Sequence, residues 1–422
     1  MQSELPTQTD VLIIGAGPAG SAAAAWAARS GLDVVLADAQ VFPRDKTCGD
    51  GLTPRAIAEL QHLGLGGWLE SQPRNRGLRA AGFGQTLMLP WPGGSLPDHG
   101  SAVPRTELDA RIRQVAVDSG ARTADGHRAV SITKENGRIG SVTFEVRSDG
   151  AKATREISCK RVIVADGARS QLGRQLGREW HKETAYGVAG RAYITSARSD
   201  DEWISSHLEL RGEQNEVLSG YGWIFPLGDG EVNIGVGTLA TTKRPADINL
   251  RSLTQLYTEQ QRKLWELHGD FRMFSSALLP MGGAVSNIAG PNWMLIGDAA
   301  GCVNPLNGEG IDYGLETGHH AAEILSSTSN NAVVDYTHIW PGELSIRYGT
   351  AFSIARRIAG LLTVPGFIST LGPVGMRSNF LMTIALRVMG NLVTDEDMDA
   401  TARLWRAAGR ASIKLDQRAP FS

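Results

Sequence analysis

The stretch DVLIIGAGPAG, residues 10–20, decides the fold of this 422-residue chain. Residues 11–14 form an unbroken apolar run, which is typical of a strand buried on both faces of a parallel sheet. Gly15, Gly17 and Gly20 follow with GxGxxG spacing, and the alanine-rich stretch up to Arg29 predicts a helix. Strand, glycine turn and helix in this order indicate a dinucleotide-binding unit.

Each glycine of this turn has a physical role. The first permits the tight turn, the second lets the backbone approach a pyrophosphate, and the third lets helix and strand pack closely. The open N–H groups at the start of the helix favour phosphate binding. A second strand-like run, residues 33–37, ends in Asp38, an acid placed to bind a ribose hydroxyl. We therefore expect the cofactor to contact Asp38 and the whole turn: Gly15, Ala16, Gly17, Pro18, Ala19 and Gly20.

Length, charge and cysteine content bound the class of protein. The chain is long enough for two or three domains. A net charge of -2 argues against nucleic acid as a partner. Three widely spaced cysteines, Cys48, Cys159 and Cys302, predict a reducing compartment and no metal site. Glycines and a proline interrupt the first apolar stretch, so we expect no secretion signal.

The rest of the chain alternates between buried strands and glycine-rich loops. Residues 41–56, VFPRDKTCGDGLTPRA, follow the ribose acid directly, which favours a site over a solvated connector. Buried strands at 162–164 and 293–296 lead into Ala165-Asp166-Gly167 and into the loop 297–318. Between them, strand-like segments at 186–238 predict an inserted antiparallel sheet.

These segments predict an α/β fold with three parts. A Rossmann-like dinucleotide-binding domain comprises residues 1–75, 101–180 and 275–343. A substrate domain built on the inserted sheet comprises residues 76–100 and 181–274. Residues 344–422 form a C-terminal helical segment that faces the membrane.

The C-terminal segment differs in charge from the rest. Residues 344–394 hold five arginines and no aspartate, glutamate or lysine, and residues 358–376 carry no charge. Prolines and glycines interrupt that uncharged run, so one spanning helix is not expected. Two interpretations remain: a helical cap over the core, or a surface that lies on anionic lipid.

Three separated elements resemble the FAD contacts of the para-hydroxybenzoate hydroxylase-like flavoproteins: the first glycine turn, Ala165-Asp166-Gly167, and Gly297-Asp298. Within that group, CGDGLTPRA (48–56) and YGWIFP (221–226) resemble the geranylgeranyl reductase family, whose pattern is PxxYxWxFP. Leu218 stands where the first proline of the pattern would fall. FPRDKTCGDGLTPRA, LPMGGAV, NWMLIGDAA and CVNPLNGEGIDYGLETG are similar to the members of this family that reduce menaquinone.

The resemblance implies FAD as the cofactor and assigns further site residues. Cys48 would lie beside the flavin and assist catalysis, while Tyr221, Trp223 and Phe225 would shape an isoprenoid channel, although ordinary strand packing also explains their period of two. Added to the glycine turn and Asp38, the implied FAD-binding residues are Cys48, Gly49, Asp50, Gly51, Arg105, Ala165, Asp298, Gly310 and Ile311.

For two of these residues the sequence allows a second role besides FAD binding. Arg105 begins a predicted helix and can pair with the pyrophosphate, or it is a solvated surface arginine. Asp298 follows a buried strand and can accept a hydrogen bond from the ribityl chain, or it only caps a helix. The start of a helix after Gly310 favours negative charge on the flavin ring by about 0.3–2 kcal/mol.

The implied activity is the saturation of one C=C in the prenyl tail of menaquinone, within menaquinone biosynthesis. Alternatives are another polyprenyl lipid or diphosphate, a class A flavin monooxygenase or halogenase, and a flavin-containing quinone sensor without turnover. Such a tail stays in a bilayer, so we expect a peripheral protein on the cytoplasmic face of the cell membrane, in contact with anionic lipids. No second GxGxxG follows a strand, so the electron donor is NAD(P)H bound transiently or another redox protein.

Overall fold

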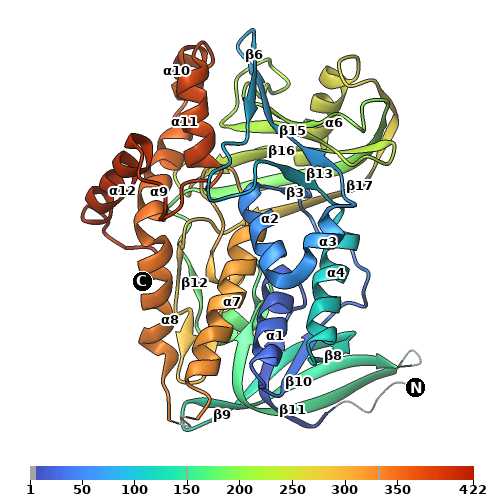
Figure 1. Cartoon of the computed structure of the whole chain (residues 1–422), viewed down its shortest axis with the longest axis vertical. Coiled ribbons are helices and arrows are strands. Elements are labelled where there is room, and N and C mark those ends of the chain that lie inside the picture. The colour runs from blue at the N-terminus through green and yellow to red at the C-terminus, as the bar shows by residue number, and fades with distance from the viewer. Residues whose placement is uncertain (1–5, 149–150, 331–332) are drawn as a thin grey trace.

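The computed structural model describes residues 6–148, 151–330 and 333–422. Two large sheets form its framework, and they occupy opposite ends of the molecule (Figure 1). Helices cover one face of the lower sheet, and a C-terminal group of helices runs along one side of both.

The first sheet has eight strands and contains the predicted dinucleotide unit. Its central order is β19-β20-β11-β1-β2-β8, with β9 and β10 continuing from β11. The strands are β1 (Gln8–Ile14), β2 (Val34–Asp38), β8 (Arg122–Asp125), β9 (His127–Glu135), β10 (Arg138–Ser148), β11 (Ala151–Val164), β19 (Ala289–Gly290) and β20 (Trp293–Leu295). β1 pairs in parallel with β2 and β11, and β11 with β20, as their unbroken apolar runs predict.

Helices α1, α4 and α7 pack side by side in front of this sheet (Figure 1). The helices of this part are α1 (Pro18–Arg29), α2 (Pro54–Leu60), α3 (Gly66–Leu69), α4 (Arg105–Asp118), α5 (Gln171–Gln175) and α7 (Ile311–Ser327), with a π-helical turn at Gln61–Leu65 after α2 and a 3-10 turn at Gly297–Ala300. Close packing is possible because α1 is built largely of alanine and glycine, and a Cβ on Gly318 of α7 would lie 2.5 Å from the carbonyl oxygen of Ala19.

The second large sheet has seven strands in the order β17-β13-β16-β15-β14-β5-β6. They are β5 (Gly77–Gly82), β6 (Gln85–Pro90), β13 (Tyr186–Ser196), β14 (Trp203–His207), β15 (Gly220–Pro226), β16 (Glu231–Ala240) and β17 (Leu267–Leu279), and α6 (Leu250–Gln261) packs against it. The sheet departs from the prediction in two ways. β14 pairs in parallel with β5, and β17 ends at Leu279, beyond the predicted boundary at 274.

Two small sheets connect the large ones. β3 (Gly51–Leu52), β7 (Gly100–Ala102) and β4 (Arg74–Asn75) form one, and β12 (Glu179–Trp180) pairs with β18 (Val285–Ser286) in the other. β3 follows Cys48 directly, so the small sheet fixes the loop 41–50 between the two large sheets.

The C-terminal segment is helical, as its sequence predicts. It comprises α8 (Tyr336–Leu344), a π-helical turn (Ser345–Gly349), α9 (Thr350–Leu362), α10 (Phe367–Gly375), α11 (Asn379–Met389) and α12 (Ala400–Ile413). Tyr336, Trp340 and Phe352 are buried in the main core, so α8 and α9 cap the first domain. α10 and α11 continue to the end of the molecule that holds the seven-stranded sheet (Figure 1).

No single helix in the described ranges is long and apolar enough to cross a membrane. Residues Tyr336–Leu362 and Phe367–Gly375 pass that test only as a pair, and the pair is bent by 112°.

The arginines of 344–394 correct the prediction that this segment is unopposed by acids. Four of the five meet carboxylates that stand outside 344–394. Arg347 pairs with Glu343, and Arg387 pairs with Asp399 at 2.8 Å. Arg356 and Arg357 share Asp416, at 3.5 and 2.7 Å. Among the described residues, no ion pair is recorded for Arg377, which is exposed between α10 and α11.

Candidate active site

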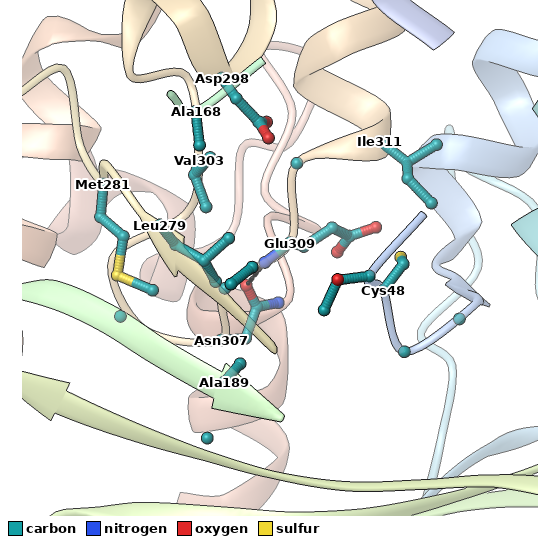
Figure 2. Close-up of a pocket in the computed structure, with 18 of the residues that line it drawn as sticks. Cys48, Ala168, Ala189, Leu279, Met281, Asp298, Val303, Asn307, Glu309 and Ile311 are labelled. Atoms are coloured by element: carbon teal, nitrogen blue, oxygen red, sulfur yellow. Dashed lines mark hydrogen bonds between the residues drawn. The ribbon is translucent and has the colours of Figure 1, made fainter. Parts of the chain in front are cut away.

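A cavity of about 1130 Å³ brings most of the predicted site residues together. Its wall combines the strand ends of the first sheet, the loop 41–50, the seven-stranded sheet and the α10–α11 pair. The predicted residues on this wall are Gly15, Gly17, Pro18, Ala19, Asp38, Cys48, Gly49, Gly51, Arg105, Ala165, Tyr221, Trp223, Phe225, Asp298, Gly310 and Ile311. Figure 2 shows Asp298, Cys48, Glu309 and Ile311 around it.

Three predicted cofactor residues are not on that wall. Ala16 is buried in the turn, where its N–H donates to Asp38 Oδ2 at 2.7 Å. A Cβ on Gly20 would lie 1.8 Å from the carbonyl oxygen of Gly15, so this glycine serves the packing of α1 on β1. Asp50 is fully buried and turns away from the cavity. These three residues support the site without lining it.

The glycine turn leaves open space at the one point where a phosphate needs it. Gly15 has φ 101°, and a Cβ there would lie 2.3 Å from the carbonyl oxygen of Ala165. A Cβ on Gly17 would instead meet only Arg44 Nη2, at 3.6 Å. Gly15 is therefore required by the fold, whereas Gly17 keeps the cavity side of the turn open.

Two helices begin at this cavity without a side-chain cap. α1 starts after Gly17 and α7 after Gly310, and neither N-cap residue accepts a hydrogen bond through a side chain. Their free N–H groups and positive dipole ends favour anionic groups. Asp38 ends β2 on the same wall. These donors and this acid fit the pyrophosphate, flavin edge and ribose of FAD.

Arg105 is not a surface residue, because only 6% of it is exposed. It donates to both oxygens of Asp109, at 2.6 and 2.8 Å, and Arg44 pairs with the same carboxylate at 2.8 Å. Two guanidinium groups thus share one acid beside the cavity, which leaves a positive charge on a wall that also holds the glycine turn. This balance suits an anionic cofactor.

The CGDG loop and the aromatic strand β15 are in direct contact. A Cβ on Gly51 would lie 2.8 Å from the Phe225 ring, and one on Gly49 would lie 3.2 Å from it. Asn233 joins the two elements: it accepts from Trp223 Nε1 at 2.9 Å and donates to the Cys48 carbonyl at 3.0 Å. Glycines are needed in the loop because the rings leave no room for side chains.

Cys48 is held in its neutral thiol form. Its Sγ accepts the Asp50 N–H at 3.4 Å. Burial raises the pKa of the thiol, and the nearby Arg105 opposes this only in part. The Asp50 carboxyl accepts from Tyr193 Oη at 2.7 Å and from Asn233 Nδ2 at 2.8 Å, while burial raises its pKa to about 6. The loop therefore carries a protonated sulfur beside the cavity at neutral pH.

The far end of the cavity is apolar and is closed by helices. Tyr221 donates its hydroxyl to the Asn307 carbonyl, so its ring is fixed across the wall. Tyr221, Trp223 and Phe225 follow in a row, with ring centroids 6.0 and 6.4 Å apart. Beyond them the lining comes from α10, α11 and the turns beside them: Phe367, Ile368, Leu371, Met376, Met382, Leu386 and Met389.

Sequence reasoning missed several residues that shape the site, among them Tyr193, Asn233, Asn307 and Glu309. Three of them act through hydrogen bonds between elements far apart in the chain, which no local spacing reveals. Glu309 is different, because it stands within the quoted loop and lines the cavity. A carboxylate among glycines directly before a helix was the available signal.

Together, the parallel sheet with its glycine turn and the cavity under two uncapped helix starts define an FAD-dependent oxidoreductase. A family model described as "FAD binding domain" matches residues 8–335. The chain is 61% identical to a menaquinone reductase of Mycolicibacterium smegmatis, over 99% of this chain and 100% of the relative. It is 60% identical to a menaquinone reductase of Mycobacterium tuberculosis, over 98% of each chain. The chain belongs to the FAD-binding domain family and, within it, groups with these reductases.

Solved structures agree on the fold. A geranylgeranyl bacteriochlorophyll reductase-like protein from Thermoplasma acidophilum superposes with a TM-score of 0.76 at 20% identity, over 96% of this chain and 100% of its own. A flavin-dependent brominase superposes with a TM-score of 0.72 at 19% identity, over 97% and 100%. At such identities the two neighbours show the architecture alone.

Proposed function

We propose that this chain saturates one C=C in the prenyl tail of menaquinone, as a step of menaquinone biosynthesis. The observation that carries the proposal is the extent of one cavity. It begins at the glycine turn for FAD and ends among apolar side chains of α10 and α11. The relatives named menaquinone reductase, at 60–61% identity over nearly the full length, support the choice of substrate.

The chemistry needs placement and a proton. An isolated alkene has no conjugated carbonyl to stabilise negative charge, so position and a proton source must lower the barrier. Bound FAD, once reduced, would supply the hydride. The row Tyr221, Trp223 and Phe225 holds the tail and excludes water, and Cys48 keeps its proton on Sγ at the same wall.

The α10–α11 pair is our candidate for the entrance from a membrane. Its outer side exposes Val374 (59%), Phe380 (73%) and Leu381 (47%), whereas its inner side lines the cavity. Arg377 adds a cation between the two helices. Apolar residues next to a basic one suit the interface with anionic lipids. This supports a peripheral position on the cytoplasmic face of the cell membrane.

Tail binding contributes enough free energy for such an exchange. At about 0.8 kcal/mol per buried CH₂, one five-carbon isoprene unit contributes roughly 4 kcal/mol. The bilayer shields the tail from water to the same extent, so an apolar path from lipid to cavity lets the tail move without exposure to water. NAD(P)H or another redox protein would reduce the flavin. The chain has one GxGxxG turn, which we assign to FAD, so a direct assay of flavin reduction with each donor is needed to distinguish the two.

The test is the quinone content of membranes from cells with and without this chain, measured by mass spectrometry. We expect a gain of two hydrogen atoms confined to the prenyl fragment of menaquinone. Hydrogenation of a different polyprenyl lipid would change the substrate but keep the reaction. Oxygen consumption that depends on an added aromatic substrate would identify a monooxygenase and contradict the proposal.

A further inference from the structure

Three acids connect the FAD cavity with a second cleft. Glu309 lines the cavity, Glu316 lines a cleft of about 1100 Å³ on the other side of α7, and Asp312 lines neither. Asp312 and Glu316 are four residues apart and share one face of α7, whereas Glu309 stands in the loop two residues before the helix begins. They therefore follow one another from the inside of the protein outward.

Glu309 forms the inner end of this row. Its Oε1 accepts from Thr53 Oγ1 at 2.8 Å, whereas its buried Oε2 has no partner among the described residues. Figure 2 shows its carboxyl group on the cavity wall. The Tyr221 hydroxyl is close enough to both Glu309 and Cys48 for each to raise its pKa. Glu309 thus stands at the cavity wall with one buried carboxyl oxygen free to hold a proton.

Asp312 forms the middle of the row and is completely buried. Its Oδ1 accepts from the Tyr313 N–H at 2.7 Å, and its Oδ2 from Asn391 Nδ2 at 2.9 Å. The charged and titratable groups that act on it are Glu309, Glu316, Tyr313 and Arg55. No described side chain forms an ion pair with it.

Glu316 forms the outer end. It accepts from Arg55 Nε at 2.5 Å and from Tyr348 Oη at 2.8 Å, and Glu59 stands beside the pair on α2. The cleft around them is lined by polar groups that include Arg347, His319 and His320. Water in this cleft therefore reaches Glu316 and Glu59.

Three of these carboxyl groups, those of Glu309, Asp312 and Glu59, have raised pKa values. Burial and the neighbouring acids raise the pKa of Asp312 to about 6 and that of Glu59 to about 7, and they raise the pKa of Glu309 well above its ordinary value. This shift favours the protonated form of Glu309, while Asp312 and Glu59 titrate close to neutral pH. Asp312 and Glu59 can therefore supply a proton to Glu309 after Glu309 has given up its own.

We propose that Glu309 donates the proton for alkene reduction and is reprotonated from the second cleft through Asp312 and Glu316. This rests on the proposed function. In the balanced reaction one carbon of the C=C gains a hydride, with its two electrons, from the reduced cofactor, and the other carbon gains the Glu309 proton. The π bond is lost, two C–H bonds form, the cofactor is oxidised, and the Glu309 carboxylate takes up one proton through Asp312.

The kinetic test distinguishes the proton donor, Glu309, from the residue that reprotonates it, Asp312. Reduced holoenzyme is mixed with a short prenyl quinone in detergent, and the saturated product is measured in the first turnover and, with excess dithionite, in later ones. Glu309→Gln should slow the first turnover by about 100-fold. Asp312→Asn should keep the first turnover, because Glu309 already holds its proton, and slow the later ones more than about tenfold. Glu323→Gln, an exposed position further along α7, is the control and should behave as wild type.

A second readout needs no cofactor. An acid whose pKa is raised by folding binds more protons when folded, so stability rises as pH falls through the folded pKa and is lost as pH rises. The melting temperature of FAD-free wild type should therefore fall as pH rises from about pH 4 to about pH 7, and Asp312→Asn should flatten the part between about pH 4 and about pH 6.

Equal rates for Asp312→Asn and wild type in both phases would overturn the relay. Equal slowing of both phases would also overturn it, because a purely structural role predicts that result. An unchanged dependence of the melting temperature on pH in Asp312→Asn would show that this carboxyl does not titrate there, and the relay would be wrong. If wild type forms no saturated product, the proposed function itself fails and the relay fails with it.

Discussion

The first glycine turn and the segment 344–394 contrast in how far local sequence determines their chemistry. In the turn, the close contacts of Gly15, Ala16 and Gly20 come from within the turn or from the ends of the neighbouring parallel strands. In the C-terminal segment, the sequence shows five arginines and no acid, yet three of them meet carboxylates from beyond residue 394 and Arg347 pairs with Glu343 just before the segment. The chemistry of a motif can be predicted when the residues it contacts are close in the chain. The charge of a surface depends largely on ion pairs with residues far away in the chain, which the local sequence does not show.

The largest expected effect tests the turn. Gly17→Val should fold, because a Cβ at this position meets only Arg44 Nη2 at 3.6 Å, but its side chain takes the space of a phosphate. Losing two hydrogen bonds to a charged group costs about 3–6 kcal/mol, so the FAD dissociation constant should rise by at least about 100-fold. Flavin fluorescence titration measures it. Gly67→Ala, where a Cβ meets nothing within 4 Å, is the control. Normal FAD retention in Gly17→Val would refute this role of the turn.

The next effect tests the arginine pairing. Asp416→Asn leaves Arg356 buried without its carboxylate, and losing one member of a buried pair should cost about 3 kcal/mol. The melting temperature should fall, while FAD occupancy of the folded protein stays as in wild type. An unchanged melting temperature would show that the Asp416 carboxylate does not stabilise the buried Arg356.

A smaller effect concerns Asp38. Asp38→Ala removes the acceptor of the Ala16 and Gln40 N–H groups, at 2.7 and 2.8 Å, as well as the expected ribose contact. Loss of a charged acceptor costs about 1.5–3 kcal/mol, so FAD should be released during gel filtration. Asp38→Asn, which keeps an acceptor oxygen, should retain more flavin. Full occupancy in the alanine variant would remove Asp38 from the cofactor site.

The smallest expected effect concerns Arg377 in the C-terminal segment. Arg377→Gln should leave stability unchanged and weaken binding to anionic vesicles by about 1 kcal/mol, or roughly fivefold. Vesicle flotation at two salt concentrations measures it. Arg347→Gln, which loses a pair with Glu343 on its own helical run, should float as wild type does. Equal loss in both variants would show that the exposed turn between α10 and α11 has no special part in membrane contact.

Much of the fold was predictable from residues 10–20, 162–167 and 293–311, because buried parallel strands and glycine turns have strong local patterns. The cavity wall confirms that these segments meet. What sequence could not predict are contacts across the chain: Asp50 turned inward to Tyr193 and Asn233, and β14 paired with β5. Such contacts depend on how two sheets dock, which no single segment encodes.

The loop that contains Cys48 also shows what the sequence alone does not explain. The resemblance placed Cys48, Gly49 and Gly51 beside the flavin, and the structure gives the physical reason, since Phe225 fills the space where side chains would be. Cys48 itself remains a prediction. Cys48→Ala and Cys48→Ser should both lower turnover, with the serine variant the more active if the sulfur only positions substrate. Wild-type turnover in both would exclude Cys48 from the mechanism.

The most direct test of the central claim blocks the cavity between FAD and membrane. Ala385 of α11 lines the cavity, and Thr383 two positions away is exposed. We predict that reduced Ala385→Trp keeps its FAD but no longer hydrogenates the tail of menaquinone in vesicles, whereas Thr383→Trp does so at the wild-type rate. Mass spectrometry of the quinone measures both. Full hydrogenation by Ala385→Trp would contradict the account, because the tail would then reach the flavin by a path outside this cavity.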